Sequence, residues 1–376
     1  MDIAELLMLT VEKNGSDLHL NVGAPPCIRV HGEMEPQEYP ELTKDDIHGM
    51  LYDIMTDAQK SRFEETRDLD FSVELGGVGR FRVNVLMTRR GEGAVFRTIP
   101  TKIKSVDELG LPSVCRELTK PERGLVLVTG PTGSGKSTTL AAMIDLINET
   151  RRGHILTIED PIEFVHQHKK CLVTQREVGP HTSSFATALR AALREDPDVI
   201  LVGEMRDYET ISLAVTAAET GHLVFGTLHT SSAHQTIDRI IDVFPEAQQN
   251  QIRTQLAESI QGVLSQALLR TADGKGRVCA VEVMVGVPAV RNLIREGKTF
   301  QIPSILQTGQ SDGMQTMDSC LINLVKSGKV HRDEALPLVT DKDTFNKQVG
   351  MGGAPSAGMG IPMGAPAMGL NLPPRR

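Results

Sequence analysis

The segment Gly130 to Ser137 reads Gly-Pro-Thr-Gly-Ser-Gly-Lys-Ser and lies between an apolar run, Leu125 to Thr129, and a stretch with helical apolar spacing, Lys136 to Ile147. Glycines at these places let backbone N–H groups converge on phosphate oxygens, and the amino end of the following helix adds a favourable dipole. The chain must therefore form a strand, a phosphate-binding turn and a helix in succession.

This loop predicts that the chain binds ATP and Mg²⁺. We expect Lys136 to reach the β- and γ-phosphates and the Ser137 hydroxyl to ligate Mg²⁺. The alternative interpretation is a glycine-rich turn without a ligand. The residues predicted to hold the nucleotide are Gly130, Pro131, Thr132, Gly133, Ser134, Gly135, Lys136, Ser137 and Thr138.

Short apolar strands alternate with helical patterns from Gly124 onward, which predicts an α/β fold with a mostly parallel sheet and helices on both faces. The predicted strands are Leu125–Thr129, His154–Ile158, Val199–Val202 and Leu223–Leu228. The predicted helices between them are Lys136–Ile147, Ser184–Arg194, Tyr208–Glu219 and Ala233–Val243.

Two acidic residues after predicted strands are candidates for the chemistry. Glu204 follows Val199–Val202, where a nucleotide-hydrolysing protein places an acid near Mg²⁺, so we assign it as catalytic and as a metal ligand, partly through water. Glu163 follows His154–Ile158, and we predict that it positions the attacking water. The alternatives are a solvated loop carboxylate for Glu204 and an acidic turn at Asp160-Pro161 for Glu163.

Histidines and arginines form a second group of candidates. His222 and His229 flank Leu223–Leu228 and are expected at opposite ends of that strand, where either senses the γ-phosphate, stabilises a subunit contact or is structural. Three arginines precede the nucleotide-binding region on strand-like segments, where an arginine could complete a neighbouring subunit's active site or be solvated. They are Arg80, Arg82 and Arg97.

Composition shifts divide the chain into five parts. Residues 1–100 mix helix and strand signals and read as a small α/β domain, and 101–121 is a proline-punctuated linker. The ATPase core is expected over 122–285 and a helical lobe over 286–345. Residues 346–376 are rich in Gly, Met and Pro, and we expect them to be disordered.

Charge and composition exclude several classes of protein. The formal net charge is −8 and aromatic residues make up 3% of the chain, so we expect no nucleic-acid binding. The first ten residues do not read as a signal peptide and no apolar run spans a membrane, which predicts a cytoplasmic protein without direct membrane insertion. The five cysteines are widely separated, which argues against a zinc module.

From Ile3 to about residue 345 the chain resembles the type IV pilus retraction ATPases, the PilT-type twitching-motility proteins of the secretion ATPase superfamily. The segments that carry this resemblance are Ser16–Leu20, the phosphate-binding loop, Glu159–Glu163, Asp196–Asp207, Thr220–Thr230 and Ala289–Glu296. The last of these resembles the retraction motif of the family, with Val290 where isoleucine is commoner.

The resemblance implies a PAS-like N-terminal domain, a RecA-like P-loop ATPase domain and a homohexameric ring. It implies that Glu163 is the catalytic glutamate, Glu204 the Walker B acid, and His222 and His229 the His-box residues, with arginines reaching across subunits. It also implies a place at the cytoplasmic face of the inner membrane at the pilus base, a membrane platform protein as partner and a paralogous retraction ATPase as a further partner.

Other functions remain open from the sequence. A pilus-assembly or type II secretion ATPase usually carries a four-cysteine zinc insertion, which the lone cysteines oppose. An accessory retraction ATPase is a closer alternative. A nucleotide-gated binding module with little turnover belongs to a different class, as does a nucleic-acid translocase, which the acidic charge opposes.

Overall fold

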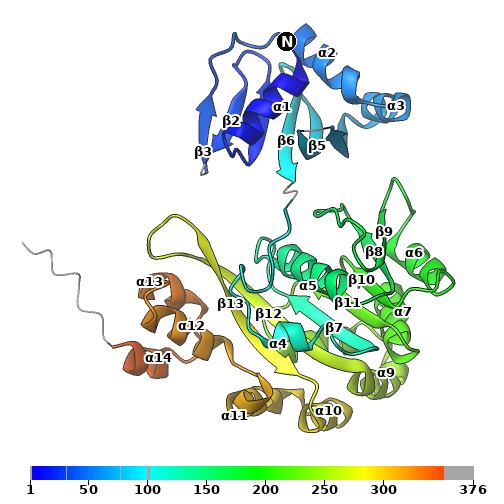
Figure 1. Cartoon of the computed structure of the whole chain (residues 1–376), viewed down its shortest axis with the longest axis vertical. Helices are drawn as coiled ribbons and strands as arrows, with labels where there is room; N and C mark the ends of the chain where they lie inside the picture. Colours follow the sequence, from blue (N-terminus) through cyan, green and yellow to red (C-terminus); the bar gives the residue numbers. More distant parts are fainter. Residues whose placement is uncertain (1, 31, 77, 100–101, 351–376) are drawn as a thin grey trace, which may run out of the picture.

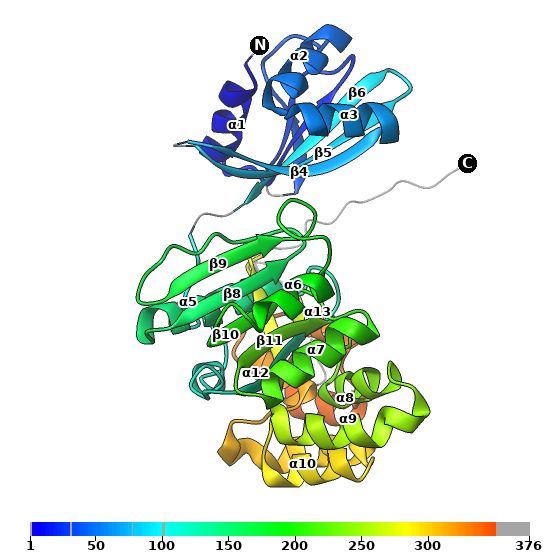
Figure 2. The same cartoon turned by 90° about the vertical axis from the view of Figure 1, so that its right-hand side faces the viewer.

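The computed structural model describes residues 2–30, 32–76, 78–99 and 102–350. Two domains follow one another along the chain, and they are the upper and lower bodies in Figures 1 and 2. Among the described residues, no helix is both long enough and apolar enough to cross a membrane.

The N-terminal domain is a six-stranded antiparallel sheet in the order β3-β2-β1-β6-β5-β4, covered by three helices. In Figure 2 the helices lie on the side of this sheet away from the larger domain. Its elements are α1 (Ile3–Glu12), β1 (Asp17–Asn21), β2 (Cys27–Val30), β3 (Glu33–Pro36), α2 (Lys44–Ile54), α3 (Asp57–Thr66), β4 (Asp68–Leu75), β5 (Gly79–Thr88) and β6 (Gly91–Ile99).

Strand β5 contributes one set of side chains to the core of this domain and another set to the opposite face of the sheet. Successive side chains of a strand point to opposite faces, so Phe81, Val83 and Val85 enter the core and are fully buried. Arg80 and Arg82 therefore lie on the other face of the sheet. Arg82 is the register partner of Arg97 on β6, which places two cations side by side on that face.

The larger domain is a seven-stranded sheet in the order β13-β12-β7-β11-β10-β8-β9, in which β13 alone pairs antiparallel to its neighbour. Its elements up to the last strand are α4 (Val114–Glu117), β7 (Gly124–Thr129), α5 (Lys136–Thr150), β8 (His154–Glu159), β9 (Leu172–Glu177), α6 (Phe185–Ala192), β10 (Val199–Val202), α7 (Tyr208–Glu219), β11 (Leu223–Leu228), α8 (Ala233–Asp242), α9 (Glu246–Ser259), β12 (Ile260–Arg270) and β13 (Arg277–Val285).

Helices cover both faces of this sheet, as the alternating pattern predicts. One core cluster joins α5 and the segment around α4 to one face, and the other joins α6, α7, α8 and α9 to the opposite face. All residues of β7, β10 and β11 are buried, which explains why these strands are continuous apolar runs in the sequence. The predicted strand and helix boundaries fall within a few residues of those observed.

The segment 101–121 is more than the linker expected from its prolines. Val106, Leu111, Val114, Cys115 and Leu118 are buried against α5 and the sheet of the larger domain. Apolar residues spaced along a proline-rich stretch provide enough buried surface to fix it on a neighbouring core. Most of this segment therefore belongs to the larger domain, which contains the ATPase core expected from the sequence and is called the ATPase domain from here on.

The helices beyond β13 form two groups rather than the single lobe expected over 286–345. Val290 and Ile294 of the first group join the core of the ATPase domain, whereas Leu321 and Phe345 pack in a separate cluster against β12 and β13. These elements are α10 (Pro288–Arg295), η1 (Thr299–Gln301), α11 (Ile302–Thr308), η2 (Gly309–Asp312), α12 (Met317–Lys326), α13 (Arg332–Ala335), η3 (Leu336–Leu338) and α14 (Lys342–Val349).

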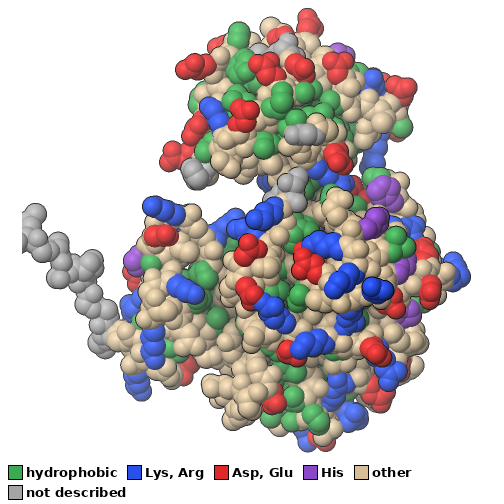
Figure 3. All heavy atoms as spheres, in the orientation of Figure 1, with side chains coloured by type: hydrophobic (Ala, Val, Ile, Leu, Met, Phe, Trp, Pro, Cys, Tyr) green, Lys and Arg blue, Asp and Glu red, His purple; other side chains and the backbone are tan. Residues whose placement is uncertain are grey.

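Helix α14 crosses the boundary set at residue 345, because buried Phe345 anchors it to the second group of helices. The rest of the expected disordered tail, residues 351–376, lies outside the described residues. All five cysteines are free thiols, and Cys115 and Cys171 are buried. On the face shown in Figure 3, acidic side chains predominate on the N-terminal domain, whereas acidic and basic side chains are interspersed on the ATPase domain.

We predict that Leu118→Ala lowers the free energy of unfolding of the ATPase domain by about 2–4 kcal/mol, because it leaves a cavity in a well-packed core. Leu118 is 4% exposed and packs against the backbone at Gly262 of β12. Urea unfolding of the full chain measures the change. Leu338→Ala, at a side chain that is 42% exposed, serves as the control and should change stability little. Equal effects of the two variants would contradict the packing of this segment.

Candidate functional site

A cleft of about 580 Å³ lies between the two domains. The phosphate-binding loop forms one wall, and residues at the carboxyl ends of β8, β10 and β11 form another. Parallel strands bring their carboxyl ends to one edge of a sheet, so residues far apart in sequence meet there. The cleft brings together these predicted residues: Thr132, Gly133, Gly135, Lys136, Ser137, Thr138, Glu163, Glu204, His229, Arg82 and Arg97.

The phosphate-binding loop depends on the backbone freedom of its first glycine. Gly130 has a φ of 138°, and a Cβ at this position would lie 2.3 Å from the carbonyl oxygen of Gln266 on β12. Gly133 and Gly135 also have positive φ, which directs the loop into the amino end of α5. Helix α5 then begins at Lys136, so its free N–H groups point into the cleft.

Lys136 closes back over the loop from the first turn of α5. Its Nζ donates to the carbonyl oxygens of Gly130 at 2.9 Å and Pro131 at 3.1 Å. Burial lowers the pKa of Lys136, and the nearby carboxylates of Glu204 and Glu163 oppose that effect. Both predicted acids are therefore close enough to act on the same ammonium group.

Glu204 forms a polar cluster directly after β10. Its Oε1 lies 2.6 Å from Nε2 of His229, and Arg206 forms an ion pair with the same oxygen. Burial acts to raise the pKa of Glu204, but the hydrogen bonds from Arg206 and His229 outweigh it and the pKa is lowered. Glu204 is thus held as a carboxylate at the edge of the cleft.

Glu163 lies on the loop that follows β8, with an exposed side chain that lines the cleft. Its neighbour Glu159, at the end of β8, accepts hydrogen bonds from Thr157 at 2.7 Å and Gln175 at 3.1 Å. Burial raises the pKa of Glu159 to about 7. Both glutamates line the cleft, but Glu163 is exposed, whereas Glu159 is half-buried and held by two hydrogen bonds.

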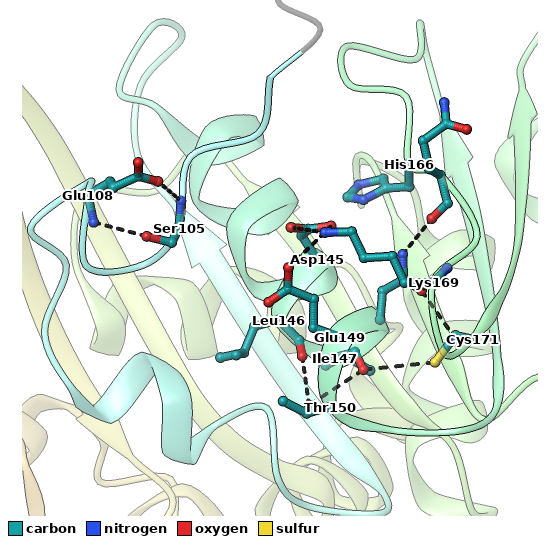
Figure 4. Close-up of polar contacts among 12 residues, drawn as sticks. Ser105, Glu108, Asp145, Leu146, Ile147, Glu149, Thr150, His166, Lys169 and Cys171 are labelled. Atoms are coloured by element: carbon teal, nitrogen blue, oxygen red, sulfur yellow. Dashed lines mark hydrogen bonds and ion pairs between the residues drawn. The ribbon is translucent and has the colours of Figure 1, made fainter.

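Two neighbours fix the path of the loop that carries Glu163. Gln175 of β9 donates to the carbonyl of Phe164 at 2.9 Å and accepts from the backbone N–H of His166 at 2.8 Å. Farther along, Lys169 pairs with Asp145 and Glu149 of α5, as Figure 4 shows. The loop is thereby joined both to β9 and to the helix that follows the phosphate-binding loop.

Asn148 of α5 adds further contacts to the same loop. Its amide donates to the carbonyl of Gln167 and accepts from the backbone N–H groups of Lys169 and Cys171. His166 itself is buried and lines the cleft, and burial lowers its pKa to about 4, so it is neutral at physiological pH. His166 is therefore a residue of the site that the sequence analysis did not select.

Arg82 and Arg97 line the cleft together with the phosphate-binding loop of their own chain. Nε of Arg97 lies 2.9 Å from Oδ1 of buried Asp17, which holds the guanidinium on the face turned to the ATPase domain. The sequence left open whether these arginines complete the site of a neighbouring subunit or are solvated. Within one chain both line the cleft, because the sheet of the N-terminal domain faces its own ATPase domain.

The cleft does not include two of the predicted catalytic residues, Arg80 and His222. Arg80 turns to β9, where its Nη2 lies 3.2 Å from Oε2 of Glu177. His222 lies at the amino end of β11, and its Nδ1 is 3.0 Å from the carbonyl oxygen of Ala217. A strand of six residues separates His222 from His229. Of these two histidines, therefore, His229 lines the nucleotide cleft and His222 does not.

Several residues of the site carried little signal in the sequence. Arg206 lies within a segment recognised by resemblance, but its ion pair with Glu204 was not foreseen. Asp17 and Glu177 had no pattern that assigned them to the site, because their partners Arg97 and Arg80 lie far away in the sequence. Gln175 contacts the nearby loop at Phe164, but no sequence pattern indicated that contact.

The oxygen donors in the cleft fit a magnesium ion that is shared with a nucleotide. Ser137 and Glu204 both line the cleft, and Glu204 is held ionised. Mg²⁺ usually takes one or two protein oxygens and completes its shell with phosphates and water. Within the part of the chain that the structure describes, no group of three or more His, Cys, Asp or Glu residues could hold a metal ion by itself.

The family model for type II/IV secretion system proteins matches residues 2–335. The chain is 58% identical over 335 residues to the type IV pilus retraction ATPase PilT of Pseudomonas aeruginosa, covering 89% of this chain and 97% of the relative. It is 41% identical over 336 residues to the type IV pilus ATPase PilU of the same organism, covering 89% and 88% of the two chains.

Among solved structures, the chain is similar to the crystal structure of the pilus retraction motor PilT with bound ADP. The TM-score is 0.87 and the sequence identity is 48%, with 92% of this chain and 99% of that chain covered. The X-ray structure of the Legionella pneumophila ATPase DotB is also similar, with a TM-score of 0.77, 30% identity, and 90% and 96% of the two chains covered.

We predict that Glu159 makes the stability of the chain depend on pH. Its pKa rises from 4.5 to about 7 on burial, so between these values the folded chain keeps a proton that the unfolded chain has released. The free energy of unfolding should therefore fall as pH rises through this range, by roughly 1–3 kcal/mol.

Glu159→Gln should remove this fall, because the amide keeps the Oε1 acceptor and cannot ionise. Urea unfolding at pH values spanning the range measures it. Glu149→Gln, at a carboxylate on the surface of α5, is the control and should behave as the original chain does. Parallel pH profiles for Glu159→Gln and the original chain would contradict the assignment.

Proposed function

The chain belongs to the family of type II/IV secretion system proteins, and from that premise we propose that it is the ATP-hydrolysing motor of type IV pilus retraction. The reaction is ATP + H2O to ADP and phosphate, at a P-loop ATPase site. The similarity to PilT extends over both domains of this chain.

One observation carries the proposal beyond nucleotide binding, namely that two domains share the cleft. Lys136, Glu163 and Glu204 come from the ATPase domain, whereas Arg82 and Arg97 come from the N-terminal domain. A nucleotide that contacts both domains biases their relative position, and loss of its γ-phosphate changes that bias. A phosphate-binding loop is sufficient for a nucleotide switch or a kinase. A motor also needs a second domain whose position changes relative to the first.

The residues have distinct roles in the proposed reaction. The N–H groups at the start of α5 and the ammonium of Lys136 bind the phosphates. Ser137 and Glu204 would hold Mg²⁺, which would supply positive charge beside the phosphates. The carboxylate of Glu163 accepts a hydrogen bond from the attacking water and orients it. Arg82 and Arg97 stabilise the charge that develops on the transferred phosphoryl group. His229, paired with Glu204, senses whether the γ-phosphate is in place.

The motor acts as a homohexamer at the cytoplasmic face of the inner membrane, where it turns a platform protein at the base of the pilus. A paralogous retraction ATPase is a further partner in this proposal. We propose no role for nucleic acid, since the net charge of the chain is −8.

The sequence identities favour a retraction motor over an accessory retraction ATPase. The chain is 58% identical to PilT and 41% identical to PilU over nearly the same length, which supports a principal rather than an accessory retraction ATPase. A nucleotide-gated module with little turnover remains the alternative from a different class. Steady-state ATPase measurements separate it from a motor.

We predict that Glu163→Gln abolishes ATP turnover while the dissociation constant for Mg-ATP changes little. The amide cannot act as the water-orienting base, but it keeps the shape of the side chain. Loss of one such group costs on the order of 10²–10⁴ in rate. Turnover by phosphate release and binding by calorimetry measure the two effects, with Lys136→Ala as the variant that loses binding. Unchanged turnover would remove Glu163 from this role.

In the host, deletion of the gene should leave surface pili in place and abolish twitching motility, because retraction is lost while assembly continues. The original gene should restore motility and the Glu163→Gln gene should not. Loss of pili on deletion would point instead to an assembly ATPase.

We predict that Arg97→Ala and Lys136→Ala do not complement one another when mixed in one ring. Both side chains serve the cleft of one chain, so no subunit of a mixed ring built from these two variants has a complete site. ATPase activity across mixing ratios measures this. Activity above the sum of the two parents would place Arg97 at the site of the neighbouring subunit.

A further inference from the structure

Arg80 and Glu177 connect the two domains outside the nucleotide cleft. Nη2 of Arg80, on β5, lies 3.2 Å from Oε2 of Glu177, on β9. The two side chains are 18% and 6% exposed, so water screens the pair poorly. Strand β9 is an edge strand of the ATPase sheet, which leaves its end accessible to the N-terminal domain.

The same carboxylate oxygen also holds the loop that carries Glu163. Oε2 of Glu177 accepts a hydrogen bond of 3.1 Å from the backbone N–H of Ile162. Ile162 is buried and directly precedes Glu163. One oxygen atom therefore joins a cation of the N-terminal domain to the residue next to the proposed catalytic glutamate.

The remaining anchors of this loop belong to the ATPase domain. Gln175 holds its middle, and Lys169 fixes its far end to α5 (Figure 4). Arg80, by contrast, moves with the N-terminal domain. A buried carboxylate whose cation is withdrawn is poorly balanced, and it takes up new contacts or admits water. Movement of the N-terminal domain thus changes the group that fixes Ile162.

We propose that Arg80 and Glu177 are positioning residues that set Glu163 for hydrolysis only while the N-terminal domain is closed on the ATPase domain. This inference rests on the proposed ATPase function and adds a route by which domain position controls turnover. Arg80 does not line the nucleotide cleft. It acts through Glu177 and Ile162, whereas Arg82 and Arg97 act within the cleft.

The first test compares Arg80→Ala with Arg80→Lys and with a control, Arg176→Ala, in the full chain. Arg176 is next to Glu177 on β9, but its ion pair with Glu195, at 3.0 Å, stays within the ATPase domain. Arg80→Ala should lower kcat on the order of tenfold, as expected for coupling between two sites. The dissociation constant for ADP and the oligomeric state should not change. Arg80→Lys should recover most of the loss, and Arg176→Ala should keep the original kcat.

The second test uses Glu177→Gln, which keeps an acceptor for the N–H of Ile162 and removes the charge that Arg80 requires. If the two residues act as one unit, the loss of kcat in Arg80→Ala/Glu177→Gln should equal that of Arg80→Ala rather than the product of the single losses. Amide exchange of residues 160–166 should speed up in Arg80→Ala, while exchange in α8 stays unchanged.

The outcomes separate this inference from the proposed function. If the original chain fails to hydrolyse ATP, the proposed function is wrong. If it hydrolyses ATP and Arg80→Ala keeps its kcat, or loses no more than Arg176→Ala, the positioning role is wrong and the ATPase assignment stands. Multiplicative losses, unchanged exchange at 160–166 or a higher kcat in Arg80→Ala would each overturn the positioning role as well.

Discussion

The turn at Gly130 sets the geometry on which the site depends. The central strand β7 ends there with a backbone that only glycine adopts easily, pressed against Gln266 of β12. Because β8, β10 and β11 run parallel to β7, their carboxyl ends reach the same edge of the sheet. The phosphate-binding loop, Glu163, Glu204 and His229 are therefore neighbours through strand order alone.

The N-terminal domain adds Arg82 and Arg97 to the cleft at the edge of the ATPase sheet. Alternation along β5 places Phe81 and Val83 in a core of their own and leaves Arg80 and Arg82 on the face toward the ATPase domain. The domain can thus remain folded while it moves, and it carries its cations with it. Arg82 lines the cleft. Arg80 pairs with Glu177, whose carboxylate accepts a hydrogen bond from the backbone N–H of Ile162. In the proposed mechanism, these two contacts couple the position of the N-terminal domain to ATP hydrolysis.

Acidic and basic side chains lie close together in the cleft. Lys136 lies near Glu163 and Glu204, which oppose the lowering of its pKa by burial. Arg206 and His229 keep Glu204 ionised, whereas burial raises the pKa of Glu159 to about 7. Two carboxylates at one edge of the sheet therefore have pKa values shifted in opposite directions by their surroundings.

The sequence by itself determined the phosphate-binding loop, the order of strands and helices, and the placement of Glu163, Glu204 and His229 after strands, because these follow from local periodicity and turn chemistry. It did not determine that residues 106–118 join a core, that Arg82 and Arg97 face their own chain, or that Arg80 leaves the cleft for Glu177. Arg80 and Glu177 are 97 positions apart, and Leu118 packs against Gly262 of a strand much later in the chain, so tertiary packing decided these contacts.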